Sequence, residues 1–344
     1  MSSSTLFGAL VVALAGFLIG TSAWPIKVLR KYEFEHWLFV GEFLGLVVFP
    51  WTITLAFCPH AFAAYRSVEQ SILIKSNIFA LCWGIANVLC CLCYVRIGVA
   101  LTGAVLAGLG VSVGVTMPML IKGTGLFSKA PAIWSPAGRI VLVGVAVMLI
   151  GVALSSAAGF GRDHILNKQH KTQGNFLIWL ILTSIAGILS CGLSFAFVYS
   201  QGPVVEALKA QGAASTPATF GVWAIGLMGG ALVNILYPAY LMTKHKSWHI
   251  LVDNTGDFLL ASCIGVTLVI TVVLMGKGML MLGAMGASVG FGIQQALQML
   301  GCQSLGFVSG EWKGIHGKPV KMMQAAIATL IIATLIMAYG NSLL

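Results

Sequence analysis

Ten apolar stretches, each long enough to cross a lipid bilayer, follow one another along the chain, and nearly all ionisable residues lie in the short gaps between them. A helix needs about 20 apolar residues to span the hydrocarbon core. The runs are continuously apolar, whereas barrel strands alternate between apolar and polar side chains, so the sequence predicts helices. The expected spans are residues 5–27, 36–58, 72–94, 98–121, 139–158, 176–200, 218–242, 256–276, 279–307 and 322–342.

The composition also excludes a soluble protein. Only 8% of the residues are charged and 58% are hydrophobic, whereas about a quarter of the residues of a soluble domain are charged. Of the 19 basic residues, 12 follow odd-numbered spans. The positive-inside rule then places the odd-numbered gaps in the cytoplasm and both termini on the periplasmic side. The net charge of +10 therefore faces anionic membrane lipid and requires no nucleic-acid partner.

The longest polar gap, residues 159–175, lies almost at the midpoint of the chain. Five expected spans precede it and five follow it. We therefore expect a first five-helix repeat at 1–158, a central polar loop at 159–175 and a second five-helix repeat at 176–344.

Pairs of glycines recur at four-residue spacing within the expected spans. Such faces let helix backbones approach closely, which is how helices associate in lipid. The pairs are Gly16 and Gly20, Gly41 and Gly45, Gly110 and Gly114, Gly226 and Gly230, and Gly286 and Gly290.

Glu42 is the one carboxylate that lies clearly within an expected span. Burial disfavours the charged form of a carboxyl group, so Glu42 is a candidate to load and unload a proton when water reaches it. A purely structural glutamic acid, hydrogen-bonded in its neutral form or paired with Lys27, is the alternative interpretation.

Amide and aromatic side chains form the second group of candidate site residues. Trp83 and Asn87 are one helical turn apart and share a face. An indole can lie flat against the apolar face of a ring, and an amide matches hydroxyl groups as both donor and acceptor. Hydrogen bonds between helices are the alternative role for any one of these amides. The candidate substrate-binding residues are Trp24, Trp83, Asn87, Tyr199, Gln201, Asn234, Gln294, Gln295 and Gln298.

This set is poor in charge, which favours a neutral, hydroxyl-rich solute over an anionic one. The sequence contains no phosphate-binding loop and no cluster of metal ligands, so we expect neither a cofactor nor a metal. The eight cysteines lie within or at the ends of apolar spans and are interpreted as packing residues. No HExxH motif, Asp pair or Ser/Lys dyad lies in the spans, so an enzyme is not expected.

Several stretches of the chain resemble the bacterial L-rhamnose/proton symporters of the drug/metabolite transporter superfamily. They occur in order across nearly the whole chain: Trp24-Pro25-Ile26-Lys27 with Pro50-Trp51; Cys82 to Asn87 with Arg96, Gly98, Gly110, Gly114 and Pro118; Ser194-Phe195-Ala196 with Glu206, Gly229, Gly230 and Asn234; and Glu311-Trp312-Lys313 with Lys318-Pro319-Val320. The resemblance implies ten transmembrane helices in two inverted five-helix repeats, and import of a 6-deoxyhexose with protons. The assignments of Glu42 and of the glutamines come from the residues themselves.

The sequence therefore predicts an all-α secondary transporter of the bacterial inner membrane, which imports L-rhamnose or a related neutral sugar with protons by alternating access. A carrier or exporter of another neutral metabolite, such as an amino sugar, a nucleoside or an amide, is the alternative. A sensory or scaffolding membrane protein should carry a soluble effector domain or a long tail; we expect neither, because the outermost spans lie within a few residues of both ends.

Overall fold

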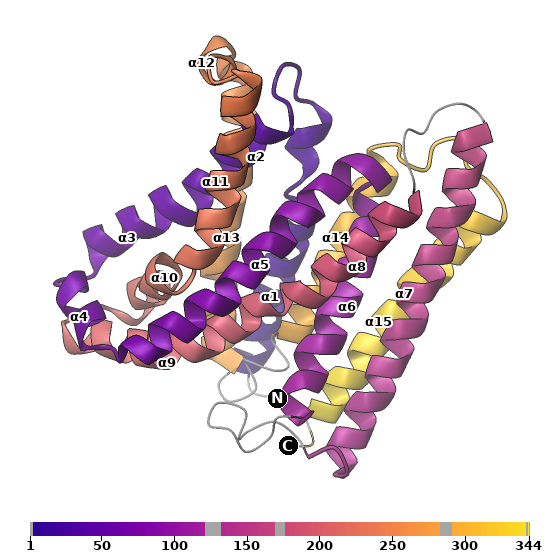
Figure 1. The fold of residues 1–344 in the computed structure, drawn as a ribbon. Helices are drawn as coiled ribbons and strands as arrows, with labels where there is room; N and C mark the ends of the chain where they lie inside the picture. The colour runs from indigo at the N-terminus through magenta and orange to yellow at the C-terminus, as the bar shows by residue number, and fades with distance from the viewer. Residues whose placement is uncertain (1–2, 121–131, 169–175, 283–290, 342, 344) are drawn as a thin grey trace. The chain divides into compact units, whose positions relative to one another are not determined.

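The computed structural model describes residues 3–120, 132–168, 176–282, 291–341 and 343, and every regular element in these ranges is a helix (Figure 1). The prediction of an all-α chain is therefore confirmed for this part of the protein. Eight helical segments in it are long and apolar enough to cross a membrane. They are Leu6–Lys27, Phe34–Phe57, Gln70–Ile97, Val99–Met117, Pro136–Leu166, Phe176–Ala210, Thr255–Gly278 and Lys318–Met337.

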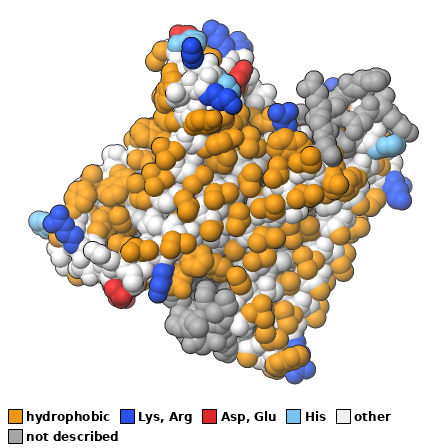
Figure 2. Space-filling view, in the orientation of Figure 1, with side chains coloured by type: hydrophobic (Ala, Val, Ile, Leu, Met, Phe, Trp, Pro, Cys, Tyr) orange, Lys and Arg blue, Asp and Glu red, His pale blue; other side chains and the backbone are white. Residues whose placement is uncertain are grey.

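A bent pair of helices, Ser215–Gly226 and Met228–His245, makes a ninth candidate span. The expected span at 279–307 lies partly outside the described residues, and its described part contributes the end of one helix and most of another. Figure 2 shows one face of the molecule, on which hydrophobic side chains cover the lengths of the helices and charged side chains gather at their ends. This distribution is that of a multi-pass membrane protein.

The helices form two compact units, and the chain passes between them four times. Unit 1 comprises Met1–Thr21, Leu89–Cys191 and Gly278–Leu344, and unit 2 comprises Ser22–Val88 and Gly192–Lys277.

Unit 1 is built on close helix pairs. Its elements are α1 (Ser3–Thr21), the end of α5 (Gln70–Ile97), α6 (Val99–Leu120), α7 (Pro136–Lys168), α8 (Phe176–Ser190), α14 (Phe291–Val308) and α15 (Lys318–Asn341). α15 lies antiparallel along α7, with Gly144 against Met337 and Gly161 against Pro319. Gly16 and Gly20 place α1 directly on the backbone of α14, as the glycine spacing predicted.

Helix α7 continues well beyond the expected end of its span at residue 158 and reaches Lys168. Arg162 explains part of this difference, because its side chain is buried and pairs with Glu311 at 3.9 Å. A basic residue that looks like part of a loop in the sequence thus lies on a packed helix face.

Unit 2 contains the bent span and the carboxylate of interest. Its elements are η1 (Trp24–Lys27), α2 (Phe34–Glu42), the π-helical segment η2 (Phe43–Val48), α3 (Phe49–Phe57), α4 (Ala61–Ser67), most of α5, α9 (Gly192–Ala210), α10 (Ser215–Gly226), α11 (Met228–His245), α12 (Ile250–Asp253) and most of α13 (Thr255–Leu282). Its core gathers buried side chains of α4, α9 and α10, among them Tyr65, Leu208 and Trp223.

The break between α10 and α11 bends the span by 56°. A break inside a bilayer frees backbone groups that must find other partners. Asn77 of α5 supplies them: its amide nitrogen donates to the Ile225 carbonyl at 3.1 Å, and its amide oxygen accepts from the Gly229 N–H at 2.8 Å. Ser76 donates to the Gly226 carbonyl at 3.0 Å. The bend is therefore held by side chains of α5.

The loop before α2 is held by Asp257 in the first turn of α13. Its carboxylate accepts hydrogen bonds from the backbone N–H groups of Arg30, Lys31 and Tyr32, at 3.1, 2.6 and 2.9 Å. Burial and the nearby Asp257 charge raise the pKa of Tyr32 to about 12. The Tyr32 hydroxyl therefore stays protonated and donates to the Leu251 carbonyl at 2.8 Å.

Candidate functional site

Glu42 is the last residue of α2, and the π-helical segment begins immediately after it. Single π-helical turns inside α-helices occur often at functional sites. Gly41 and Gly45 face α13, where an added Cβ would meet Ile264 at 3.1 Å and Leu268 at 2.8 Å. This close approach leaves the side chain of Glu42, which is 7% exposed, directed towards α5.

Two asparagines complete a hydrogen-bonded group with Glu42. The Nδ2 atom of Asn87 on α5 donates to Glu42 Oε1 at 2.9 Å and to Asn234 Oδ1 at 2.8 Å. Asn234 on α11 is fully buried, and its Nδ2 donates to the Gly230 carbonyl at 2.9 Å. The structure thus brings together three residues that the sequence had singled out from three different spans. We call Glu42, Asn87 and Asn234 the carboxyl–amide cluster.

One fully buried atom of this cluster lacks a hydrogen-bond partner among the described residues. Glu42 Oε2 is buried and makes no hydrogen bond to any described residue. A buried polar atom left without a hydrogen bond costs about 1–3 kcal/mol, so such atoms in native proteins call for an explanation. A water molecule or a ligand hydroxyl at Oε2 would remove this cost.

Trp83 lies one turn before Asn87 on the same face of α5. A Cβ added to Gly230 would lie 2.7 Å from the edge of the Trp83 indole and 2.8 Å from the Ala80 carbonyl. A Cβ added to Gly84 would lie 2.7 Å from the Gly230 carbonyl. The two glycines therefore allow α5 and α11 to touch, and this contact places the indole beside the asparagines.

The remaining candidate residues of unit 2 lie outside the hydrogen-bonded carboxyl–amide cluster. Tyr199 on α9 stacks on Phe79, with ring centroids 5.6 Å apart, and Phe79 precedes Trp83 by one turn of α5. Gln201 is half-buried on α9, and Trp24, in the turn η1, is 42% exposed. Among the described residues, none of these three side chains hydrogen-bonds to the carboxyl–amide cluster.

The three glutamines belong to unit 1. Gln294 and Gln295 on α14 are 6% and 7% exposed, and Gln294 Nε2 donates to Gln298 Oε1 at 3.3 Å. Gln295 Nε2 lies 3.8 Å from the position of a Cβ at Gly110 of α6. The shared face of Gln294 and Gln298 that the spacing predicted is present, and the two amides bind each other.

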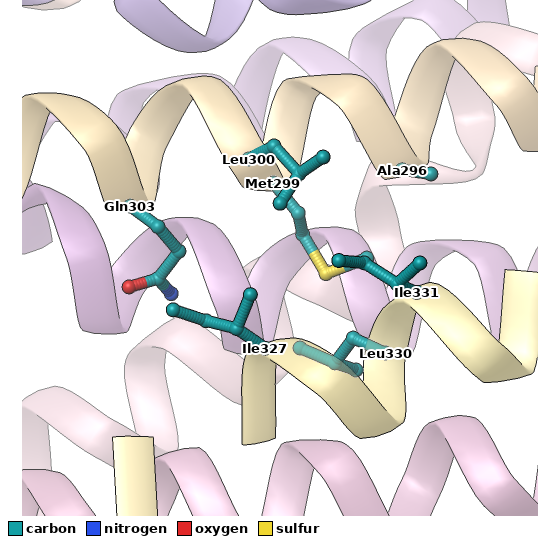
Figure 3. A pocket seen from close by; sticks show the side chains of 7 residues that line it. All are labelled: Ala296, Met299, Leu300, Gln303, Ile327, Leu330 and Ile331. Carbon is teal, nitrogen blue, oxygen red and sulfur yellow. The ribbon is translucent and has the colours of Figure 1, made fainter. Parts of the chain in front are cut away.

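A small pocket in unit 1 lies between α14 and α15 (Figure 3). Gln303 is the one polar side chain that lines it, and its Nε2 donates to the Ala100 carbonyl at 2.7 Å. The other lining residues are Ala296, Met299, Leu300, Ile327, Leu330 and Ile331. An almost wholly apolar lining does not suit a hydroxyl-rich solute.

Asn77 is a positioning residue that the sequence analysis did not single out. It holds the bend that directs α11 towards α5, and so places Asn234 opposite Asn87. Its signal in the sequence is spacing, because Asn77, Gly84 and Asn87 lie at intervals of seven and three residues, along one helix face.

Long apolar helices around a buried carboxyl–amide cluster define the class: a multi-pass α-helical membrane protein with the polar interior typical of a transporter. The particular family follows from comparison of sequences. The chain belongs to the L-rhamnose-proton symport protein (RhaT) family, whose sequence profile matches residues 2–342.

Curated relatives agree with this assignment. The chain is 28% identical over 257 residues to the L-rhamnose-proton symporter of Yersinia pestis bv. Antiqua (strain Antiqua), covering 71% of each chain. The L-rhamnose-proton symporter of Yersinia pseudotuberculosis serotype O:1b (strain IP 31758) gives the same identity and coverage. Membership of a symport family makes this chain a transporter and not an enzyme.

Proposed function

We propose that this protein imports L-rhamnose, or a closely related 6-deoxyhexose, together with protons by alternating access. The observation that carries the proposal is the carboxyl–amide cluster, in which Asn87 binds one oxygen of a buried Glu42 while the other oxygen has no hydrogen-bond partner among the described residues. Comparison of sequences also supports the proposal, because the chain belongs to the L-rhamnose-proton symport family.

Glu42 carries the proton in this proposal. Ionisable groups inside membrane spans are costly and commonly mark ion and proton pathways. The Oε2 atom of Glu42, which makes no hydrogen bond to the part of the chain that the structure describes, can take a proton from water that reaches it from one side of the membrane and release it to water on the other side.

The sugar site is formed by neutral groups. The indole of Trp83 offers a flat apolar surface for a sugar ring and its methyl group, and Asn87 offers hydrogen bonds to hydroxyl groups. Trp24, Tyr199 and Gln201 are the further candidates of unit 2, with Asn234 beside Asn87. Gln294, Gln295 and Gln298 are those of unit 1.

The proposal includes ten spans in two inverted five-helix repeats, with repeats at 1–158 and 176–344 flanking residues 159–175. The order in which the chain visits the two compact units supports it. Residues 1–21, 22–88 and 89–158 belong to unit 1, unit 2 and unit 1, and residues 176–191, 192–277 and 278–344 follow the same order. An order that repeats at the chain midpoint is expected of a duplicated five-helix element.

We further propose that the protein belongs to the drug/metabolite transporter superfamily. It would lie in the bacterial inner membrane, with both termini in the periplasm. The excess of basic residues after odd-numbered spans supports this orientation. Anionic lipid faces the basic residues at the cytoplasmic rim.

The test is transport by purified protein in proteoliposomes. With an inward proton gradient, the wild-type protein should accumulate labelled L-rhamnose, and addition of L-rhamnose to weakly buffered vesicles should make the medium more alkaline. Glu42→Gln should abolish accumulation and proton movement, because an amide cannot release a proton, while exchange of labelled for unlabelled sugar continues.

Glu69→Gln is the matched control, since Glu69 is exposed and lies outside the candidate spans. It should leave accumulation unchanged. Full accumulation by the Glu42→Gln protein would remove Glu42 from its role. Exchange of an amino sugar or a nucleoside, without exchange of any 6-deoxyhexose, would favour a carrier of another neutral metabolite.

A further inference from the structure

The hydrogen bonds of the carboxyl–amide cluster all run in one direction. Asn234 is fully buried, and its Nδ2 atom lies 2.9 Å from the Gly230 carbonyl oxygen and 3.5 Å from that of Gly84. A carbonyl oxygen only accepts hydrogen bonds, whereas an asparagine amide has a donor end and an acceptor end. The donor end of Asn234 must therefore face these two carbonyls.

This orientation fixes that of Asn87. With its Nδ2 turned to the backbone, Asn234 presents only its Oδ1 atom to Asn87, so Asn87 must present its own Nδ2, and does so at 2.8 Å. The second hydrogen of the same Nδ2 group is directed to Glu42 Oε1 at 2.9 Å. Reversal of either amide would place two acceptors against each other.

We propose that Asn234 is a positioning residue, and not a sugar ligand, which sets the polarity of the proton site by holding Asn87 with its donor end towards Glu42. This inference rests on the proposed function of Glu42. Oε1 is then a permanent acceptor, and the exchangeable proton is carried by Oε2. The proton leaves Oε2 for a water molecule and returns from one, and no other bond forms or breaks.

The same polarity fixes the hydrogen-bonding roles that are open to a sugar hydroxyl at this site. Asn87 Oδ1 accepts no hydrogen bond from the described residues, and Glu42 Oε2 makes none. A sugar hydroxyl can donate to Asn87 Oδ1 and accept from a protonated Oε2 at the same time. Protonation of Glu42 thus favours sugar binding, which is the coupling that a symporter needs.

Other charged groups on the helices around Glu42 either bind other partners or are exposed. Glu35 on α2 pairs with His245 of α11 at 2.8 Å, and Asp257 on α13 binds the backbone of residues 30–32. Lys75 on α5 and Lys244 on α11 are exposed. The polarity of Glu42 is therefore set by the two amides.

The experiment uses Asn234→Asp, which keeps the shape of the side chain. The new carboxyl group accepts from Asn87 in either state, but it can donate to the Gly230 carbonyl, as Asn234 does, only when it is protonated. We expect sugar exchange, relative to wild type, to fall by about tenfold from about pH 5.5 to about pH 7.5, where a buried carboxyl group loses its proton. The thermal unfolding midpoint of the variant should rise towards the wild-type value as the pH falls.

Gln303→Glu is the matched control, in unit 1. Gln303 is also buried, and its Nε2 also donates to a backbone carbonyl, that of Ala100 at 2.7 Å, whereas Glu42, Asn87 and Asn234 all belong to unit 2. Its stability should likewise improve at low pH, while the ratio of protons to sugar transported stays at the wild-type value. In Asn234→Asp at neutral pH, that ratio should fall.

Two outcomes would overturn the inference. Equal loss of exchange by Asn234→Asp at every pH would make Asn234 a direct sugar ligand or a packing residue, and wild-type behaviour at every pH would give it no role. If the Asn234→Asp protein does not fold at neutral pH, its sugar exchange is measured after acidification. Recovery of exchange at low pH supports the inference, and continued loss of exchange in the folded protein contradicts it. Failure of the proposed function is separate, because it appears as full accumulation by Glu42→Gln in a wild-type background.

Discussion

Gly84 controls the polar interior of unit 2 through the absence of a side chain. A Cβ at this position would lie 2.7 Å from the Gly230 carbonyl oxygen and 2.8 Å from the Gly230 Cα, both of them backbone atoms that cannot rotate away. In lipid, where helices gain little from the hydrophobic effect, such close contacts supply much of the attraction between them. The residue therefore fixes the distance between Asn87 and Asn234.

We expect Gly84→Val to separate α5 from α11 and to destabilise the protein by about 1–3 kcal/mol, the usual cost of overpacking. Sugar exchange should fall more than stability does, because the hydrogen bond between Asn87 and Asn234 lengthens. Thermal unfolding in detergent and exchange in proteoliposomes measure the two effects. Gly202→Val is the control, since a Cβ there meets nothing within 4 Å. Wild-type exchange by Gly84→Val would show that the close approach is not needed.

At the scale of elements, helix ends are the weak points of a membrane protein, because their free backbone groups have no water to bind. In unit 1 the turn between α5 and α6 is closed by a buried ion pair. Glu311 accepts from the backbone N–H groups of Val99 and Ala100 at 2.8 and 3.3 Å, and Arg162 donates to the Ile97 carbonyl. One pair of charges therefore caps the end of one helix and the start of the next.

Glu311→Gln keeps the size of the side chain but leaves Arg162 as a buried charge without its counterion. We expect a loss of about 3–5 kcal/mol of stability, the cost of breaking a buried pair from one side. The unfolding midpoint of the purified protein should fall well below that of Glu206→Gln, a control at an exposed position. Equal midpoints for the two variants would show that the Arg162–Glu311 pair adds nothing to stability.

At the scale of the whole molecule, each compact unit is assembled from both halves of the chain. Unit 1 takes α1, α6 and α7 from the first half and α14 and α15 from the second, and unit 2 takes α2 and α3 from the first half and α9 to α11 from the second. Neither half contains a complete unit. The midpoint division of the sequence therefore differs from a division into independently folding domains.

We expect residues 1–168 and residues 176–344, expressed separately, to be degraded or aggregated, because each half exposes the helix faces that its partner covers. Co-expression of the two halves should restore a complex that binds and exchanges sugar. Size-exclusion chromatography of membranes solubilised after single and joint expression measures this. A stable, monodisperse half on its own would contradict the assembly described here.

The sequence by itself determined the class of protein and singled out the residues that meet in the carboxyl–amide cluster. Continuous apolar runs of span length leave the chain little choice but membrane helices, because backbone groups in lipid must be satisfied within the segment. For the same reason a lone carboxylate in such a run, Glu42, can be singled out without any structure: its burial is costly and needs a compensating role. The pairing of Asn87 with Trp83 follows from helical periodicity alone.

Only the tertiary structure decided how these residues meet. That Asn87 donates to both Glu42 and Asn234 depends on contacts between residues 45 and 147 positions apart in the chain, which local patterns do not encode. That Arg162 lies on a packed face of α7 depends on Glu311, a distant partner that makes it an interior residue. The bend at Leu227 likewise depends on Asn77, which satisfies backbone groups of another helix. Helix formation is a local matter of hydrogen bonds within a segment, whereas a polar site in a membrane exists only where several helices bring their few polar groups together.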